Sequence, residues 1–278
     1  MVSGKPALVD FEHSVLEADR LHATGGASEY GRKGLGPKLF ELLYGRNRVA
    51  PVAVERMVDE LRDSCAALGR RPRILVIGGG AVGNGLEAFY ADTTIDIVAF
   101  DIYMSPNVQF IGDGHAIPLA DGSIDGVVVQ AVLEHVLQPE IVAAEIHRVL
   151  RMGGIVYADT PFMQQVHEGP FDFTRYTDSG HRYLFRGFER IDSGQVAGAG
   201  TALMWAIRCW ARALTRSVVI GGLIGHCFFW LRYTDAILDP KFSLDAASSV
   251  FFLGRKTTRS ISRGDIIDYY QGALAIEG

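Results

Sequence analysis

The sequence predicts an α/β protein built on a doubly wound, mostly parallel sheet. Between residues 73 and 161, short apolar runs that end in glycine or aspartate alternate with helical patterns, which is typical of βαβ units. The first run, residues 74–77, consists of isoleucine, leucine and valine and is followed directly by three glycines, Gly78–Gly80. Such a run indicates a strand buried on both faces, and ligands of these sheets bind at the carboxyl ends of the strands.

The glycine turn and the acidic residue after the second strand predict a ligand that contains adenosine. Glycines let a ligand approach the main chain, and a helix expected to open at Gly83 would favour an anionic group at the turn. The second strand, residues 95–100, ends in Asp101, whose carboxylate can accept hydrogen bonds from a ribose diol. The spacing of Gly78, Gly80 and Gly83 fits a nicotinamide or flavin dinucleotide as well as S-adenosylmethionine.

Composition limits the remaining classes. A chain of 278 residues with 48% hydrophobic content can bury a substantial core, and a net charge of −5 gives no general attraction to nucleic acid, so no nucleic-acid partner is expected. Three widely separated cysteines, without C-x-x-C spacing, indicate a reducing compartment without disulfides or structural zinc. The N-terminus has no apolar signal core, so a cytoplasmic protein is expected.

Residues 1–72 are interpreted as an N-terminal accessory or cap segment with helical parts. A helix-like stretch, a glycine-rich loop and two helices that open with proline are expected over residues 8–22, 25–36, 37–44 and 51–68. The last helix places its apolar side chains along one stripe, which fits packing on a sheet. The loop at residues 28–33 is interpreted as a piece that closes over a cofactor pocket.

The strand pattern continues after Asp101. A third strand, residues 108–111, precedes GDGH, and a fourth, residues 126–130, leads into the sequence AVLEHV. A helix over residues 139–150 and a fifth strand over residues 155–159 follow.

With these motifs in place, the sequence resembles the class I S-adenosylmethionine-dependent methyltransferases, and within them the methyltransferase type 11 group, which includes ubiquinone/menaquinone-biosynthesis-like enzymes. The resemblance covers residues 72–162 and depends on five motifs in order: the glycine turn, Asp101, GDGHAIPLADGSIDGV, VLEHV and HRVLRMGGIVYADTP. It implies a Rossmann-like, seven-stranded sheet over residues 73–256 whose last strand is antiparallel and inserts beside the fifth. The sixth and seventh strands are then expected at 188–192 and 249–254, and residues 257–278 form a C-terminal tail.

The resemblance also implies S-adenosylmethionine as cofactor and gives roles to residues around it. Asp101 would bind the ribose hydroxyls, and Ile102 would lie against the adenine. Asp113 would accept a hydrogen bond from the adenine amino group, and Gln130 would face the methionine moiety. The expected cofactor-binding residues are Gly78, Gly80, Gly83, Asp101, Ile102, Asp113, Gly114, His115 and Gln130.

Two positions depart from the pattern of that family. Val76 stands where many members carry an acidic residue, and Val82 stands where many carry glycine. The first change removes an acceptor near the methionine amino group, and the second predicts that Gly83 takes the flexible role in the turn.

Methyl transfer requires alignment, exclusion of water and a base for the acceptor, so no metal is expected. Neither G-x-S-x-G nor H-E-x-x-H occurs, which disfavours hydrolases. Two alternatives stay open: an NAD(P)- or FAD-dependent oxidoreductase, supported by the glycine turn alone, and a catalytically silent module that binds S-adenosylmethionine, consistent with Val76 and Val82.

The acceptor is expected at the long loop of residues 160–177, which is rich in aromatic and ionisable groups. His167 is a candidate general base because its ordinary pKa of about 6.5 lies near neutrality, and His135 competes with it. The expected substrate-binding residues are Phe162, Asp172, Arg175 and Tyr176. In the alternative interpretation Asp172 and Arg175 pair to fix the loop, and His135 caps a helix. The loop pattern H-x-x-P-x-D-F-x-R-Y-T more loosely resembles methyltransferases of polysaccharide and glycolipid biosynthesis, which favours an oxygen of a small-molecule, glycan or lipid-linked acceptor.

An unusually apolar helical insertion is expected between the sixth and seventh strands, over about residues 201–245. It contains helical runs at 201–214 and 217–231, and the second is shorter than the roughly 20 apolar residues that a membrane span needs. Arg208, Arg212 and Arg216 are spaced four apart, so they share a helix face near tryptophans. Two roles are therefore possible for residues 201–233. They could contact the inner surface of a membrane, with the arginines toward the lipid headgroups, or they could form a lid or a homodimer interface.

Overall fold

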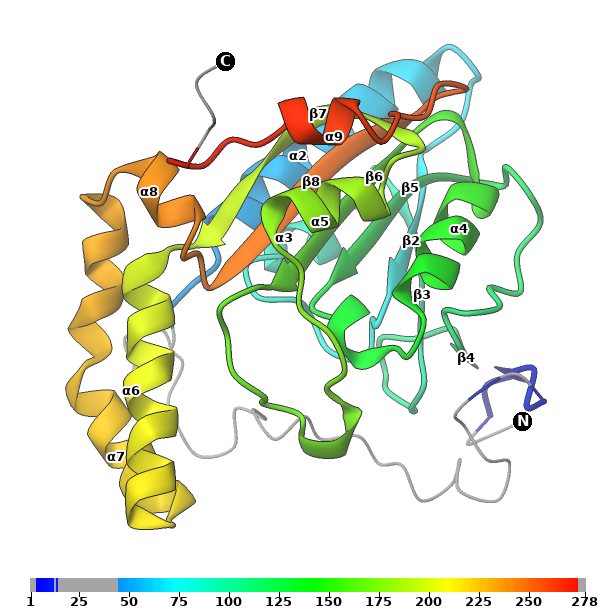
Figure 1. Ribbon diagram of the computed structural model, residues 1–278. Coiled ribbons are helices and arrows are strands. Elements are labelled where there is room, and N and C mark those ends of the chain that lie inside the picture. Colours follow the sequence, from blue (N-terminus) through cyan, green and yellow to red (C-terminus); the bar gives the residue numbers. More distant parts are fainter. Residues whose placement is uncertain (1–3, 13, 15–44, 275–278) are drawn as a thin grey trace.

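The protein is an α/β/α sandwich around one eight-stranded sheet, seen in a computed structural model that describes residues 4–12, 14 and 45–274 (Figure 1). The strands are β1 Ala7–Leu8, β2 Arg73–Ile77, β3 Asp96–Asp101, β4 Phe110–Gly112, β5 Ile124–Gln130, β6 Leu150–Pro161, β7 Phe188–Ala197 and β8 Ser249–Lys256. The helices are α2 Val49–Ala66, α3 Glu87–Ala91, α4 Pro139–Val149, α5 Asp178–Leu184, α6 Ala199–Thr215, α7 Val218–Cys227, α8 Pro240–Leu244 and α9 Asp265–Asp268. The described residues also form the 3-10 helices η2 Leu133–His135, η3 Gly169–Phe171 and η4 Phe229–Ala236.

The strand order is β1-β4-β3-β2-β5-β6-β8-β7. The pairs from β1 to β6 are parallel, and β8 lies between β6 and β7, antiparallel to both. The prediction of a doubly wound sheet whose last strand inserts beside the fifth is confirmed.

The number of strands differs by one from the prediction. The eighth strand, β1, adds Ala7 beside Ile111, and the carbonyl of Pro6 accepts a hydrogen bond of 2.9 Å from the backbone N–H of Ile111. Residues 7–8 are thus extended rather than helical. Residues 9–12 and 14 are not helical either, so the helix expected at 8–22 is wrong over its described part. Residues 15–22 of that helix, the glycine-rich loop and the helix expected at 37–44 fall outside the described residues, and the role of residues 1–72 as a cap stays a prediction.

Two hydrophobic layers bury the faces of the sheet. On β2, Leu75 and Ile77 face a cluster with α4 and α5, whereas Ile74 and Val76 face a cluster with α2 and α3. Successive side chains on a strand point to opposite faces, so the apolar residues 74–77 of β2 need helices on both sides, as Figure 1 shows. Val76 is therefore a core residue under α2, and an acidic side chain there would have to be buried.

Helix α2 begins next to the carboxyl edge of the sheet. The side-chain oxygen of Asn47 accepts hydrogen bonds from the backbone N–H groups of Val49 (3.0 Å) and Ala50 (2.8 Å). This capping satisfies two amides that a helix start leaves without intrahelical partners. It also holds the Asn47 amide near the end of β6, where it contributes to the site described below.

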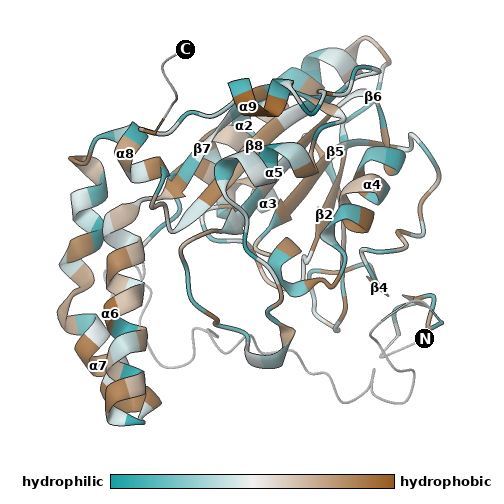
Figure 2. Cartoon of the chain, in the orientation of Figure 1, coloured by the Kyte–Doolittle hydropathy of each residue, from teal (hydrophilic) through white to brown (hydrophobic). Residues whose placement is uncertain are grey.

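The apolar insertion forms a helical hairpin between β7 and β8 that projects away from the sheet (Figures 1 and 2). Its base is fixed by Asp235, whose carboxylate accepts from the backbone N–H groups of Gly198 (3.0 Å) and Gly200 (2.7 Å) and from the hydroxyl of Thr201 (2.6 Å). The second helical run ends at Cys227 and continues as the 3-10 helix η4.

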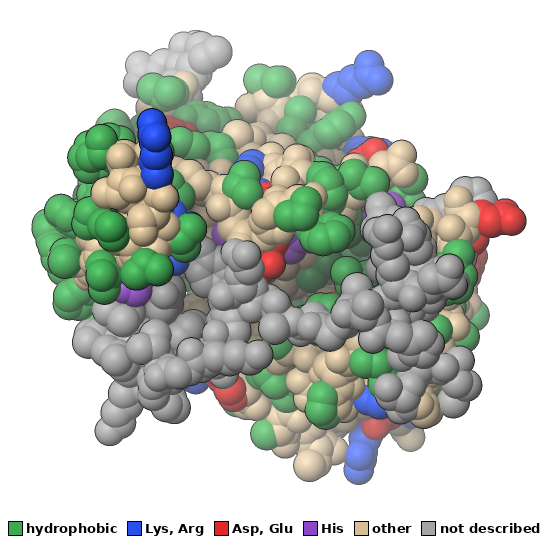
Figure 3. Space-filling view, turned by 90° about the horizontal axis from the view of Figure 1, so that it is seen from below, with side chains coloured by type: hydrophobic (Ala, Val, Ile, Leu, Met, Phe, Trp, Pro, Cys, Tyr) green, Lys and Arg blue, Asp and Glu red, His purple; other side chains and the backbone are tan. Residues whose placement is uncertain are grey.

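Two arginines of α6 pack against α7 in this hairpin, and large apolar side chains cover its exterior. The α-carbons of Gly221 and Gly225 face Arg212 and Arg208, so these two arginines lie between α6 and α7. They therefore do not form the outward arginine face expected from their spacing. Large apolar side chains point outward instead, and hydrophobic atoms gather over the insertion in Figure 3. These exposed side chains are Leu203, Trp210, Leu214, Val218, Val219, Ile220 and Leu223. Within the described residues no helix is both long and apolar enough to cross a membrane.

Candidate functional site

The turn after β2 is joined to the end of β3 by hydrogen bonds to Asp101. The backbone N–H of Gly80 donates to Oδ2 of Asp101 at 2.8 Å, and the N–H of Ile102 donates to Oδ1 at 2.7 Å. Gly78 has a φ of +73°, a conformation that glycine adopts without strain. Burial raises the pKa of Asp101 to about 6, and hydrogen bonds from the main chain of Gly80, Ile102 and Tyr103 oppose this rise. The glycine turn and Asp101 therefore meet as predicted, while the side chain of Ile102 is partly exposed beside them.

The helix expected at Gly83 begins only at Glu87, because residues 83–86 form a turn in which the N–H of Leu86 donates to the carbonyl of Gly83. The absence of a side chain at Gly83 serves another purpose. A Cβ there would lie 2.0 Å from Oε1 of Gln130. Glycine at this position thus lets the Gln130 amide approach the turn.

Gln130 belongs to a hydrogen-bonded network at the ends of β5 and β6. Its Nε2 donates to Oδ2 of Asp159 at 3.1 Å, and the same oxygen accepts from the hydroxyl of Tyr157 (2.9 Å) and from Nδ2 of Asn47 (3.3 Å). Burial raises the pKa of Asp159 to about 6, against the effect of these hydrogen bonds. Oε1 of Gln130 is buried and accepts no hydrogen bond from the described residues.

Asp113 lies after β4, on the far side of Asp101 from this network. Its Oδ1 accepts from the backbone N–H (2.9 Å) and the ring Nδ1 (2.6 Å) of His115, and its Oδ2 accepts from the hydroxyl of Ser14. Burial opposes ionisation of Asp113, but these hydrogen bonds outweigh it and lower the pKa of the carboxyl. A Cβ on Gly114 would lie 3.3 Å from Val142 on α4, so Gly114 permits close packing of this turn.

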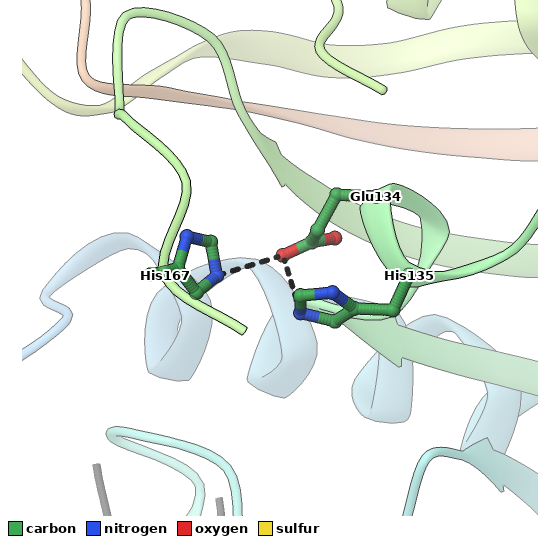
Figure 4. Close-up of side chains that lie close together, drawn as sticks. All are labelled: Glu134, His135 and His167. Carbon is green, nitrogen blue, oxygen red and sulfur yellow. Dashed lines mark ion pairs between the residues drawn. The ribbon is translucent and has the colours of Figure 1, made fainter. Parts of the chain in front are cut away.

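The two candidate bases lie on either side of Glu134 (Figure 4). Nε2 of His135 is 3.6 Å, and Nε2 of His167 is 3.9 Å, from Oε1 of Glu134, and the two imidazole rings are 5.2 Å apart. Glu134 is 1% exposed, and neither of its carboxylate oxygens makes a hydrogen bond with any described residue. Burial raises its pKa to about 8, and the charges of Asp159 and Asp172 add to this. Burial lowers the pKa of His135.

The loop after β6 is fixed by an ion pair between Asp172 and Arg175. Arg175 donates from both terminal nitrogens to the two oxygens of Asp172, and its Nε donates to the carbonyl of Gln164 at 2.7 Å. Oδ2 of Asp172 accepts from the backbone N–H of His167 at 2.8 Å, and the pKa of Asp172 falls to about 2, because these bonds outweigh the effect of burial. Asp172 and Arg175 thus form the ion pair within the loop that the alternative interpretation expected.

The other two expected substrate residues lie at the borders of the core. Phe162 packs against Leu244 and Val250, and Tyr176 packs against the cluster under α4 and α5. Beside the loop, a groove of about 610 Å³ runs between residues 164–175 and α6. Asp172 and Arg175 line this groove together with Cys209 and Arg212 of the insertion. Substrate contact by Phe162 and Tyr176 stays a prediction.

Sequence reasoning missed three residues of this site. Glu134 was visible as the acidic residue of VLEHV, and Asp159 as the acidic end of the fifth strand, by the same logic that selected Asp101. Asn47 gave no local signal, because its relation to Asp159 arises from the packing of α2 on the sheet.

Together, the doubly wound sheet, the glycine turn and the buried carboxylates at neighbouring strand ends define a Rossmann-like protein, a class of fold that binds its ligands at the carboxyl edge of the sheet. Comparison with known families shows which kind of Rossmann-like domain this is. Residues 77–158 match the model of the methyltransferase domain family. These residues therefore form a methyltransferase domain of the class I S-adenosylmethionine-dependent type.

Individual relatives match over limited lengths. The chain is 34% identical to a demethylmenaquinone methyltransferase of Renibacterium salmoninarum over 159 residues, which cover 52% of this chain and 63% of that protein. It is 47% identical over 51 residues to an uncharacterised 37.1 kDa protein in a transposon of Streptomyces fradiae, covering 18% of this chain and 15% of that one. Both matches thus span less than two thirds of the relative. A solved S-adenosylmethionine-dependent methyltransferase from Archaeoglobus fulgidus is 14% identical, with a TM-score of 0.48 over 79% of this chain and 98% of that chain.

Proposed function

We propose that the protein is a methyltransferase that uses S-adenosylmethionine and methylates an oxygen of a small-molecule, glycan or lipid-linked acceptor. The observation that carries this proposal is the junction of Gly80 with Asp101 at the carboxyl edge of a methyltransferase domain. The buried carboxylate there is held by main-chain donors at the turn that this fold uses for its cofactor.

The residues present fit the cofactor. Asp101 would accept hydrogen bonds from the ribose hydroxyls, and the buried Oε1 of Gln130, which has no donor among the described residues, would accept one from the cofactor's methionine amino group. Asp159 supplies a further carboxylate beside Gln130, in place of the acidic residue absent at Val76. Asp113 and His115 would lie toward the adenine. When bound, the cofactor supplies an electrophilic methyl group.

The acceptor would lie in the groove between the loop and α6, where the lining residue Asp172 contacts His167. A hydroxyl acceptor must lose its proton, and His167 or His135 would take it, assisted by the buried Glu134. The relative named as a demethylmenaquinone methyltransferase adds that quinone to the acceptors worth testing.

The outward apolar faces of the insertion favour a partner surface there, either the inner face of a membrane or a second copy of the chain. A membrane partner would bring a lipid-linked acceptor to the groove, whereas a dimer would leave a diffusible acceptor. The protein is proposed to work in the cytoplasm in both cases.

Calorimetric titration of the purified protein with S-adenosylmethionine, S-adenosylhomocysteine and NAD tests the proposal. Binding of the first two without NAD is expected. Binding of NAD alone would instead support the oxidoreductase alternative, whose support is the glycine turn. Binding of S-adenosylmethionine without turnover on lipid-linked sugars, small hydroxylated acceptors or demethylmenaquinone would favour the silent module.

A further inference from the structure

Glu134, His135 and His167 bring three ligand atoms of a metal-binding type to one place. Within the described residues, these atoms lie within 4.8 Å of one another, and Figure 4 shows all three side chains converging. The residues come from two elements: Glu134 and His135 from η2 after β5, and His167 from the loop after β6. From this arrangement we propose that the cluster is a binding site for a divalent transition-metal ion.

Burial of Glu134 supports the proposal first. A carboxyl group that is 1% exposed should have hydrogen-bond partners or a cation, since burying it alone is costly. Its two oxygens have no hydrogen bond with described residues, and among these residues the imidazoles of His135 and His167 lie 3.6 and 3.9 Å from Oε1. A bound cation would supply the missing partner and hold Glu134 ionised.

The orientation of the histidines supports it second. Nδ1 of His135 lies 2.6 Å from the carbonyl of Phe171, which requires a proton on Nδ1 and leaves the lone pair on Nε2 facing Glu134. Nδ1 of His167 lies 3.4 Å from Oδ2 of Asp172 and 3.3 Å from the carbonyl of Gln165, so its Nε2 also faces Glu134. Metal-bound histidines typically show this arrangement, with the outer nitrogen donating to a carboxylate or a carbonyl.

The distances fit coordination after a small adjustment. In tetrahedral zinc sites with bonds of about 2.0–2.2 Å, ligand atoms are roughly 3.4 Å apart, which is a few tenths of an ångström shorter than the distances of 3.6 and 3.9 Å from Oε1 of Glu134 to the two imidazole nitrogens. The three ligand atoms together lie within 4.8 Å, so the two histidines would have to move closer to each other around the ion. Two imidazoles and one carboxylate suit zinc, iron or cobalt, whereas magnesium prefers oxygen ligands. Three protein ligands leave positions open for an exogenous oxygen, as in catalytic zinc sites.

The place of the cluster suggests what the ion would do. Asp172 contacts His167 and also lines the groove proposed for the acceptor. An acceptor hydroxyl bound to the ion would have a lowered pKa: its O–H bond breaks, the electron pair stays on the metal-bound oxygen, and the proton leaves to solvent water. The two histidines then act as ligands instead of bases. This use of the ion rests on the proposed methyltransferase activity, whereas metal binding itself does not.

The test uses the untagged full chain, stripped with a chelator and titrated with Zn²⁺ by calorimetry and with Co²⁺ by visible absorption. We expect one ion per chain with cobalt bands typical of low coordination number. Glu134→Gln and His167→Ala should each weaken Zn²⁺ binding at least 100-fold, and Asp172→Asn, which acts through His167, should weaken it about 10- to 100-fold. The matched control is His147→Gln. His147 packs on Phe188 near the end of α4, away from the cluster, so this variant should bind Zn²⁺ as tightly as the wild type does.

Absence of Zn²⁺ binding by the wild type, or binding that these substitutions leave unchanged, would overturn the proposal. Circular dichroism shows whether each variant is folded. Because glutamine has nearly the same size and shape as glutamate, Glu134→Gln can still test metal binding if His167→Ala unfolds. Titration with S-adenosylmethionine in the presence of chelator separates the two proposals. Metal binding without cofactor binding would refute the methyltransferase proposal alone, and the reverse would refute the metal site alone.

Discussion

The backbone N–H of Gly80 and Oδ2 of Asp101 are 2.8 Å apart, and this hydrogen bond joins the glycine turn to the end of the neighbouring strand. A Cβ at Gly80 would lie 2.7 Å from that oxygen and 2.4 Å from the ring of Tyr103. The main chain of the turn thus fixes the position of the carboxylate, and such fixed acceptors favour ligand binding.

Asp101→Asn should weaken binding of S-adenosylmethionine by roughly 10- to 100-fold, because hydrogen bonds to a charged acceptor contribute about 1.5–3 kcal/mol. Calorimetry measures the change. Asp63→Asn on the exposed side of α2 removes the same charge and should leave the affinity unaltered. Equal affinity in both variants would show that Asp101 does not contact the cofactor.

The pKa of about 6 at Asp101 predicts a pH dependence of cofactor affinity. Above pH 6 the carboxylate is ionised and affinity should be constant, and below pH 6 it should fall by up to about tenfold per pH unit. The effect of pH on stability has the opposite direction. Because the pKa of Asp101 is raised in the folded state, the folded protein binds more protons than the unfolded chain between about pH 4 and 6. The free energy of unfolding therefore falls as the pH rises through this window. In urea unfolding this slope should be steeper in the wild type than in Asp101→Asn, by at most about 1.4 kcal/mol per pH unit, because the raised pKa values of Asp159 and Glu134 contribute equally to both proteins.

Gly83→Ala should displace the Gln130 amide, because the new Cβ would lie 2.0 Å from Oε1. We expect a loss of about 1–3 kcal/mol of unfolding free energy and weaker cofactor binding, measured by denaturation and calorimetry. Gly222 on α7 offers a control, since a Cβ there meets no atom within 4 Å. Gly222→Ala should stabilise the helix by up to about 1 kcal/mol, and equal effects of the two substitutions would contradict the role given to Gly83.

The apolar exterior of the insertion predicts an association that polar substitution removes. Trp210 and Leu223 are 64% and 63% exposed, so Trp210→Glu with Leu223→Glu should leave folding and cofactor binding intact. Loss of sedimentation with vesicles of anionic lipid would identify a membrane partner, and conversion of a dimer to a monomer in light scattering would identify a second copy. Ile267→Glu on α9, 72% exposed, is the control for an added charge elsewhere. A wild type that shows neither association would refute both readings.

Sequence patterns were informative where each element carries its own signal. Buried parallel strands are continuous apolar runs, so β2, β3, β5 and β6 were found, and Asp101 followed from its place at a strand end. β1 was missed because a two-residue strand has no periodicity, and its pairing depends on Ile111, a hundred residues away.

Relations between distant residues needed the structure. His135 and His167 were both predicted, but their convergence on Glu134 depends on how the loop folds back, with the backbone carbonyl of Glu134 accepting from Phe173. Likewise, the spacing of Arg208 and Arg212 gave a shared helix face without showing that α7 packs on that face through Gly221 and Gly225.

The cap that Asp235 provides at the start of α6 has a geometric consequence. Both ends of the hairpin return to the edge of the sheet, where the N–H of Ser248 donates to the carbonyl of Ala197 at 2.8 Å. The insertion is therefore attached to the sheet at both of its ends, which restricts its movement relative to the sheet. A membrane or protein surface bound to the insertion would therefore lie at a fixed distance and orientation relative to the groove. The fold thus determines how close an acceptor held in that surface can come to the site.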